Sequence, residues 1–510
     1  MGSPLSKELL SARNRDELDL TKWEGGLKAL PPRIKNCKKL LRLVLKDNQL
    51  IDLPPELGLL DSLESLDISH NNVNQFPLSL PKNIKEVKAS HNRLFYSLIT
   101  PKIGELSNLR SLDLSFNQLE LIPDEIGNLA NLKTLLLQNN DLKVICLGIT
   151  NLSALEKLHL GNNKISRIPP EITRLTLLAD LELHHNQLQK LPDSIGCLQN
   201  LKRLILGFNN LKRLPDSCGD LIRLEELCVQ ENRQMDEIPL TLQKVHTIKR
   251  ADFHGTKLDG IPLAIKTWTN LVDLVAKDNG LIEDLPSVIG NLVLLKRLDV
   301  SECCISRLPE RLSDLKLLLY LDLSKNQLKS MSFPTVMEGM ESLSRLFLSG
   351  NSLEFLPVNI CFLAHLTELD VSSNSLTNLP DEIGRLSNLA RLFLNSNKIL
   401  ALPAAIGSLH DLTVLECRSN VLTTLPAELG NVLCLTRCDL SENRLNGLPC
   451  EMAKLIQLRT FELKGNPWIE PPQSVINQGV DSILNYLQEM KKRRDKGDSA
   501  FGGKGNPSGF

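Results

Sequence analysis

A segment of about 23 residues recurs along most of this 510-residue chain, and no other feature constrains the fold as strongly. Three successive copies begin at Leu155, Leu178 and Leu201 and align without gaps: LEKLHLGNNKISRIPPEITRLTL, LADLELHHNQLQKLPDSIGCLQN and LKRLILGFNNLKRLPDSCGDLIR. Self-similarity at a fixed period of this length is typical of a stacked repeat array. An array also explains the length of the chain, which is far above what one ordinary hydrophobic core holds.

An asparagine marks the same place in most copies, within the pattern LxxLxLxxNxL. Thr256 and Cys303 occupy this place in two copies. The pattern therefore predicts 19 units between residue 40 and about residue 480. The asparagines themselves are Asn48, Asn71, Asn92, Asn117, Asn140, Asn163, Asn186, Asn209, Asn232, Asn279, Asn326, Asn351, Asn374, Asn397, Asn420, Asn443 and Asn466.

The spacing within each copy predicts how the repeat folds. The last two leucines of LxxLxL alternate as on a short strand and point inward, while the side chains between them point outward. The asparagine follows where the chain turns, and its amide can bond to backbone groups that the turn leaves unpaired. No copy can bury its leucines alone, so the copies stack into one solenoid. The pattern resembles the leucine-rich repeat, an α/β fold with a concave parallel sheet of about 19–20 short strands in a horseshoe.

The ends of the chain depart from the repeat and predict caps. Residues 1–39 contain a degenerate first unit, LDLTKWEGGLKALPPRI, and are expected to cap the N-terminus of a solenoid over residues 40–480. A helix over residues 481–494 places Val480, Ile483, Leu484, Leu487 and Met490 on one face, which would cover the last repeat. The glycine-rich residues 495–510 are expected to be disordered.

Charge and cysteine usage point to a cytosolic protein. The chain has 59 Lys+Arg against 60 Asp+Glu, which gives no broad attraction to nucleic acid. Its start has no apolar core typical of a secretory signal, and no apolar run approaches the length of a membrane span. The 12 cysteines are scattered singly, as expected for reduced, buried side chains.

The LPxxI half of the repeat is similar to that of the intracellular Ras-group leucine-rich repeat proteins of plants and animals. The resemblance covers nearly the whole chain, and LLSARNRDELDLTKWEGGLKALP and GNPWIEPPQSVINQGVDSILNYLQ resemble the end caps of related intracellular repeat proteins. It implies a scaffold for a small GTPase or a phosphatase. Two features of that group are missing: a GVYW-type segment after the repeats and an RVxF-type phosphatase-docking segment at the N-terminus.

The stretch DLELHHNQLQKLP raises the question of a metal site. His184 and His185 precede Asn186, Asp180 and Glu182 are outward strand positions, and His159 lies one unit earlier. A metal site needs three or four ligands that converge on one point, and adjacent histidines at a strand end have no built-in tendency to converge. The sequence favours no metal and no cofactor here; contact with a partner protein and a plain solvated surface remain open.

Outward positions that carry apolar residues predict a protein-binding patch. An apolar centre with a charged rim is typical of such patches, although single exposed apolar residues are also common. The predicted apolar centre is Phe116, Leu136, Ile205 and Phe208, and the predicted rim is His159, Glu182, His185, Arg203, Glu226 and Arg250.

A second candidate surface lies nearer the C-terminus. Phe347 and Phe393 occupy equivalent places two units apart, and Arg345 and Arg391 do the same. Together with Arg297 and Arg437, these arginines recur at one equivalent place in every second unit, and Tyr320 and Glu368 occupy the same place in units between them. The arginines could engage an acidic partner or pair locally with Asp299, Asp370 and Asp439, and the sequence favours local pairing.

The first residues carry a candidate modification site. Met1 and Gly2 with Ser6 fit the pattern M-G-x-x-x-[ST], so Gly2 could be myristoylated after Met1 is removed. One acyl chain binds membranes only marginally, and the basic residues 491–494 would be the second signal. The alternative is an ordinary start to a short helix.

Three classes of function remain for such a chain. The leading prediction is a monomeric, non-catalytic scaffold that binds a protein partner on its concave face. An enzyme is disfavoured because the repeats leave only short ends and contain no G-x-x-x-x-G-K-[ST], HExxH or GxSxG motif. The third class is a structural component of a larger cytoplasmic assembly.

Overall fold

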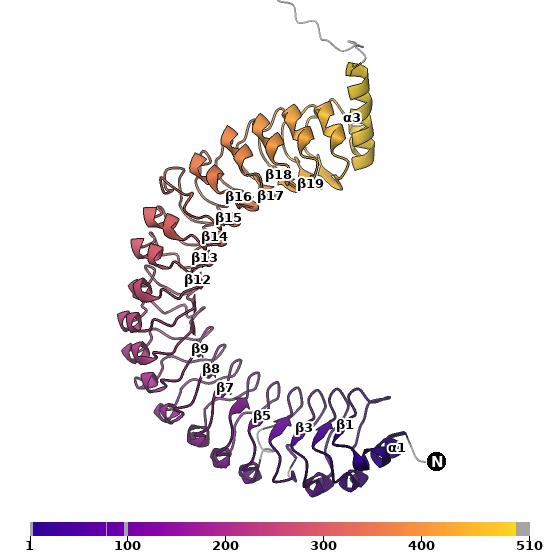
Figure 1. The fold of residues 1–510 in the computed structure, drawn as a ribbon, viewed down its shortest axis with the longest axis vertical. Helices are drawn as coiled ribbons and strands as arrows, with labels where there is room; N and C mark the ends of the chain where they lie inside the picture. Colours follow the sequence, from indigo (N-terminus) through magenta and orange to yellow (C-terminus); the bar gives the residue numbers. More distant parts are fainter. Residues whose placement is uncertain (1–3, 78, 96–99, 496–510) are drawn as a thin grey trace, which may run out of the picture. The chain divides into compact units, whose positions relative to one another are not determined.

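The computed structural model describes residues 4–77, 79–95 and 100–495, and it divides into two compact units, Met1–Leu271 and Val272–Phe510. Both units consist of the same repeat. The predicted α/β leucine-rich repeat fold is confirmed, with short parallel strands on one side of each unit and 3-10 helices on the other (Figure 1). The repeat spacing alone predicts no division at residue 271.

Among its described residues the first unit contains eleven strands, each parallel to the strands of the neighbouring repeats. Equivalent residues face each other across the strands without slippage, as in Leu158 opposite Leu181 and Leu181 opposite Leu204. The strands are β1 (Glu17–Asp19), β2 (Arg42–Val44), β3 (Ser65–Asp67), β4 (Glu86–Lys88), β5 (Ser111–Asp113), β6 (Thr134–Leu136), β7 (Lys157–His159), β8 (Asp180–Glu182), β9 (Arg203–Ile205), β10 (Glu226–Cys228) and β11 (Arg250–Asp252).

Nine strands make up the sheet of the second unit within the described part of the chain, with the same parallel register. They are β12 (Asp273–Val275), β13 (Arg297–Asp299), β14 (Tyr320–Asp322), β15 (Arg345–Phe347), β16 (Glu368–Asp370), β17 (Arg391–Phe393), β18 (Val414–Glu416), β19 (Arg437–Asp439) and β20 (Thr460–Glu462).

The leucines of the repeat form the core, as predicted. Leu181, at the centre of β8, and Leu183, just after it, are both fully buried. Their equivalents in the other repeats are buried as well, so every copy contributes the same inner wall. Burying one leucine stabilises the fold by about 1.5–3 kcal/mol, and neighbouring copies share that burial.

The asparagines build the predicted ladder, which Asn186 illustrates. Its side-chain Nδ2 donates to the carbonyl oxygens of Leu160, at 2.9 Å, and Leu183, at 3.0 Å. Its Oδ1 accepts the backbone N–H of Ile165 at 2.9 Å. One side chain therefore satisfies backbone groups of two adjacent repeats, which is why a polar residue is stable in the core.

The two copies without the asparagine follow repeats that are one residue longer. In these long repeats the backbone closes a turn of its own, in which Asn232 O accepts the N–H of Met235 and Asn279 O accepts the N–H of Ile282. In a regular repeat this backbone N–H is bonded by the side chain of the asparagine in the next repeat. In the two long repeats the corresponding N–H, that of Met235 or Ile282, is already bonded within its own turn. This turn explains why Thr256 and Cys303 can occupy the ladder position.

The LPxxI half of the repeat forms 3-10 helices on the side opposite the strands. Proline fixes an extended backbone just before the helix, as at Pro169, whose ψ is 139°. The helices of the first unit are Ala12–Asn14, Pro32–Asn36, Pro55–Leu59, Pro101–Glu105, Asp124–Asn128, Leu147–Asn151, Pro170–Arg174, Ile195–Cys197, Asp216–Asp220, Leu240–Lys244 and Leu263–Thr267, and those of the second are Ser287–Asn291, Glu310–Asp314, Val358–Phe362, Asp381–Arg385, Ala404–Ser408, Ala427–Asn431 and Cys450–Lys454.

Helices close both ends of the described chain. Helix α1 (Pro4–Ser11) precedes β1, and the short α2 (Gln473–Ile476) precedes α3 (Val480–Asp495). Helix α3 buries Ile483 and Leu487 and packs on the helix Cys450–Lys454 of the last repeat, and Arg494 pairs with Glu451 at 2.7 Å. None of the described helices has both the length and the apolar character that crossing a bilayer requires. Asp495, predicted as the first residue of a disordered tail, is instead the last residue of α3. Gly2, the predicted modification site, and residues 496–510, the rest of the predicted tail, lie outside the described residues.

Candidate functional site

The outward side chains at the first position of strands β7 to β11 alternate in charge. The register places Asp180 between Lys157 and Arg203. Glu226 in turn lies between Arg203 and Arg250. Each charge therefore has an opposite charge on the adjacent strand, at a separation set by the sheet. We call these residues, together with His159 and Glu182 at the second outward position, the central cluster.

Arg203 is the hub of the central cluster. Its Nη1 lies 2.9 Å from Asp180 and 3.2 Å from Glu182, and its Nε lies 2.7 Å from Glu226. Arg250 contributes a longer contact of 3.7 Å to Glu226. Burial by itself would lower the pKa of the Arg203 guanidinium, but the hydrogen bond to Glu226 and the three surrounding carboxylates raise it above its ordinary value. Arg203 thus stays charged and fixes the three acids in one arrangement.

His159 closes the other side of the central cluster. Its Nε2 is 3.1 Å from Asp180 Oδ2, and its Nδ1 is 3.4 Å from a carboxylate oxygen of Glu182. The Asp180 side chain is only 11% exposed. Burial would raise the pKa of Asp180, but its hydrogen bond with His159 and the neighbouring positive charges lower it below the ordinary value. The cluster is therefore an ordered ion-pair network and not a set of freely moving surface charges.

The sequence-based reasoning on metal binding considered convergence only for the adjacent histidines, and the structure brings a different set of side chains together. His159, Asp180 and Glu182 do converge, with one ligand atom from each within 4.8 Å of the others. Parallel register causes this convergence, because equivalent positions of adjacent repeats lie side by side. His184 and His185 do not join this group. The guanidinium of Arg203 already contacts both carboxylates. Arg203 therefore occupies the place beside these acids that a metal ion would need.

An aromatic pair lies just beyond the central cluster. His185 and Phe208 stack with ring centroids 4.0 Å apart, and Phe208 is 40% exposed. Both residues have a left-handed backbone, with φ of 51° and 58°, which is unusual for bulky residues. The equivalent places in the preceding repeats are Asn139 and Asn162, which tolerate this backbone more easily. Ring stacking across repeats offers an apolar surface at the edge of the sheet.

A second aromatic stack was missed by the sequence reasoning. His70, His91 and Phe116 stack in succession, with centroid distances of 4.1 Å and 4.0 Å. Burial and the charge of His70 lower the pKa of His91, which favours a neutral ring in the middle of the stack. The available signal was position, because each of these residues directly precedes a ladder asparagine, as His185 and Phe208 do.

The structure accordingly divides the predicted patch. Phe116 belongs to the His70–His91 stack, three repeats before His185 and four before Phe208. Ile205 was expected to be part of an exposed apolar centre, but it is only 9% exposed. Leu136 is half-buried on β6. Of the four predicted apolar residues, all of which the structure describes, Phe208 is the one that is exposed beside β7 to β11.

The second candidate surface has a different arrangement of charge from the one predicted. Arg297 pairs with Asp299 at 2.9 Å, as expected. Arg391 and Arg437, however, pair with Glu368 at 2.6 Å and Glu416 at 2.8 Å, not with Asp370 and Asp439. These partners lie on the preceding strand, which long arginine side chains can reach.

Tyr320 contacts Arg297, Arg345 and Phe347 of the second surface. Its ring lies between the guanidinium carbons of Arg297 and Arg345, 5.0 Å and 5.4 Å from its centroid, and Phe347 is 5.3 Å away. Arg345 therefore forms a cation–π contact. Phe393 is half-buried on β17 two repeats further along.

Comparisons with known proteins agree with this architecture. Two family models match: "Leucine-rich repeat region" over residues 147–250 and 356–497, and "Leucine Rich Repeat" over residues 108–129. Among curated proteins, a disease resistance protein of Arabidopsis thaliana is 36% identical over 98 residues, covering 19% of this chain and 11% of that protein. Podocan-like protein 1 of Mus musculus is 38% identical over 100 residues, covering 19% and 18%. The chain thus spans only a small part of these relatives.

Solved structures match over much more of the chain. The plant peptide hormone receptor RGFR1 in complex with RGF2 has a TM-score of 0.71 and 26% identity, covering 91% of this chain and 80% of the receptor. A TDR receptor has a TM-score of 0.70 and 25% identity, covering 91% and 87%. The Arabidopsis thaliana receptor kinase ectodomain GASSHO1/SCHENGEN3, in complex with CASPARIAN STRIP INTEGRITY FACTOR 2, has a TM-score of 0.58 and 26% identity, covering 89% and 67%.

Proposed function

The chain belongs to the leucine-rich repeat proteins, and on that basis we propose that it is a non-catalytic scaffold that holds a segment of a partner protein against strands β7 to β11. The observation that carries this proposal is the juxtaposition of the central cluster with the stacked pair His185 and Phe208. The cluster supplies fixed charges, and the stacked pair supplies the exposed apolar contact.

Preorganisation is the physical reason for choosing this surface. The charged side chains are already held by one another, so little additional conformational entropy is lost when a partner binds. Such a network discriminates between partners by charge pattern, while an exposed aromatic residue provides much of the binding free energy. Phe208 is 40% exposed and follows β9, the strand that carries Arg203.

The similarity to peptide hormone receptors supports an extended segment as the form of the partner. RGFR1 was solved in complex with RGF2, and the GASSHO1/SCHENGEN3 ectodomain in complex with CASPARIAN STRIP INTEGRITY FACTOR 2. A row of parallel strands offers a repeated pattern of outward side chains along its length, which suits a partner that also runs across several repeats.

The narrower proposal concerns the class of partner and the compartment. The LPxxI pattern supports a small GTPase or a phosphatase as the partner, and the twelve free cysteines support a reducing, cytosolic environment. Myristoylation of Gly2 would add a weak membrane attachment. Mass spectrometry of protein from its native source tests the modification, and fractionation of the same cells tests the compartment.

The main proposal is tested with two matched variants, Phe208→Asn and Phe116→Asn. Both replace an exposed phenylalanine that has a left-handed backbone, with φ of 58° and 53°, and asparagine accepts this backbone elsewhere in the same column. Partners are identified by affinity capture with cross-linking of the wild-type protein, and binding is then measured by titration. We expect Phe208→Asn to weaken binding by about tenfold or more and Phe116→Asn to leave it unchanged. Equal binding by wild type and Phe208→Asn, or cross-links that avoid β7 to β11, would contradict the proposal.

A further inference from the structure

A second surface, away from the central cluster, carries a run of positive charge. It consists of the residues that directly precede the Leu–Pro or Ile–Pro pair in three successive repeats: Arg167, Lys190, and Lys212 with Arg213. All four side chains are exposed. The equivalent residues change to acids in the next repeat, at Asp236 and Glu237. The repeat fold therefore does not require a basic residue at this position.

Three of these cations line a groove. The groove has a volume of about 890 Å³ and lies between the ladder asparagines and the prolines. Its lining contains no carboxylate and no aromatic or aliphatic side chain; it consists of Ser166, Arg167, Gln189, Lys190, Asn210, Lys212 and Gln234. Every one of these side chains can donate a hydrogen bond.

The cations of this groove have no partner within the described chain, unlike their neighbours. Lys143 pairs with Glu120 at 3.0 Å, and Lys164 pairs with Asp141 at 2.5 Å. No ion pair in residues 4–77, 79–95 and 100–495 involves Arg167, Lys190, Lys212 or Arg213. Like charges on adjacent repeats repel one another, so the groove is a region of unbalanced positive potential.

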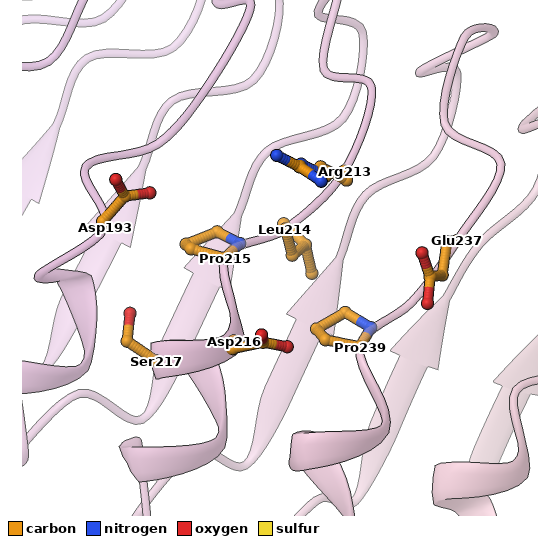
Figure 2. Close-up of a pocket in the computed structure, with 8 residues that line it drawn as sticks. All are labelled: Asp193, Arg213, Leu214, Pro215, Asp216, Ser217, Glu237 and Pro239. Carbon is orange, nitrogen blue, oxygen red and sulfur yellow. The ribbon is translucent and has the colours of Figure 1, made fainter.

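Acidic residues lie along one side of this positive region and limit its extent. Figure 2 shows Arg213 between Asp193 and Glu237, in an adjoining groove of about 390 Å³ that also contains Asp216. The positive region is thus limited to about three repeats. Because parallel strands are about 4.8 Å apart, it is suited to a compact ligand and not to a long polymer.

We infer that this basic groove binds a small polyphosphate, with phosphate groups on neighbouring carbons that engage Arg167, Lys190 and Lys212 together. Guanidinium and ammonium groups bind phosphate oxygens through short charge-assisted hydrogen bonds, and the amide and hydroxyl side chains add neutral donors. A nucleic-acid strand would need aromatic residues for base stacking, and a peptide would need apolar side-chain pockets. The lining contains neither.

The phosphate groups could belong to a free molecule or to a lipid headgroup. In the two preceding repeats Leu121 and Val144 occupy the places equivalent to Arg167, and they line an apolar groove of about 670 Å³. Its residues Leu121, Val144 and Leu147 are 47%, 51% and 56% exposed. These side chains would contact the acyl region of a membrane if the headgroup were the ligand, and would remain unused if the ligand were free.

The test is calorimetric titration of the full chain with inositol hexakisphosphate, with myo-inositol as the uncharged comparison. Arg167→Glu is compared with Arg307→Glu, because Ser166–Arg167 and Ser306–Arg307 occupy the same place in two different repeats and carry the same exposed residues. We expect binding by wild type to weaken as salt rises, a loss of roughly tenfold or more in Arg167→Glu, and little change in Arg307→Glu. Equal losses in both variants, no binding of inositol hexakisphosphate by the wild-type protein, or equal binding of myo-inositol would overturn the inference.

Vesicles distinguish the two sources of phosphate. Phosphatidylcholine vesicles with and without phosphatidylinositol 4,5-bisphosphate are sedimented with the wild-type protein and with Val144→Ser. A lipid ligand predicts co-sedimentation that requires the phosphoinositide and falls in Val144→Ser, while a free ligand predicts binding to inositol hexakisphosphate without co-sedimentation. Both results support the basic groove. Binding of a doubly phosphorylated peptide, with neither inositol probe bound, would show that the ligand class is wrong.

Discussion

Replacing Asn186 with leucine tests the asparagine ladder directly. Asn186 is 8% exposed and accepts the N–H of Ile165 while donating to the carbonyls of Leu160 and Leu183. Leucine has a similar size but can neither donate nor accept. The substitution therefore removes hydrogen bonds and leaves the packing volume nearly unchanged.

Asn186 also donates to the carbonyl of His184 at 3.3 Å, and that carbonyl keeps the N–H of Asn162 when Asn186 is replaced. The carbonyl of Leu160 keeps a hydrogen bond from Asn163, and the carbonyl of Leu183 keeps one from Asn209. Only the N–H of Ile165 is left buried without an acceptor. An orphaned buried donor costs about 1–3 kcal/mol, so we expect the free energy of unfolding to fall by about 2 kcal/mol.

Urea denaturation followed by circular dichroism gives this difference from the shift in midpoint and the slope. Hydrogen exchange at the Ile165 amide adds a local readout, because this N–H should lose its protection first. The control is Gln187→Leu, which changes the next residue, exposed and outside the ladder. A loss below 0.5 kcal/mol for Asn186→Leu, or an equal loss for Gln187→Leu, would refute the reasoning.

Three further outcomes follow from the described contacts. Arg203→Gln should reduce stability at pH 7 by about 1–2 kcal/mol, a figure that allows for the partial exposure of Arg203. Because the pKa of Asp180 is lowered in the folded state, its stabilising contribution is present at neutral pH and is lost as the pH falls through that lowered value, so the difference from wild type should shrink below about pH 4 in urea titrations. Leu487→Ala should cost about 2–4 kcal/mol in the same assay, since Leu487 is fully buried in the cap. In native protein, thiol labelling followed by mass spectrometry should modify the exposed Cys197 but not Cys438, because burial raises the pKa of the Cys438 thiol and blocks access to it.

The candidate site could be predicted only in part. His159, Glu182 and Arg203 were identified because they occupy outward strand positions of neighbouring repeats. Their assembly around Asp180 was not predicted, since two adjacent histidines drew attention to the loop and away from the strands. The exposure of Ile205 was misjudged, because a side chain that points outward from a strand is not necessarily exposed to solvent.

The sequence by itself determined the repeat, its inward leucines and its asparagine ladder. These features follow from the alternation of inward and outward side chains and from hydrogen-bond geometry within a few residues of one segment. Because the same segment recurs, every copy shows the same pattern. Only the tertiary structure decided which side chains meet across repeats. Arg203 and Glu226 are 23 residues apart in sequence but 2.7 Å apart in space. Such contacts depend on strand register, side-chain reach and the competition between neighbouring charges, which a local pattern does not contain.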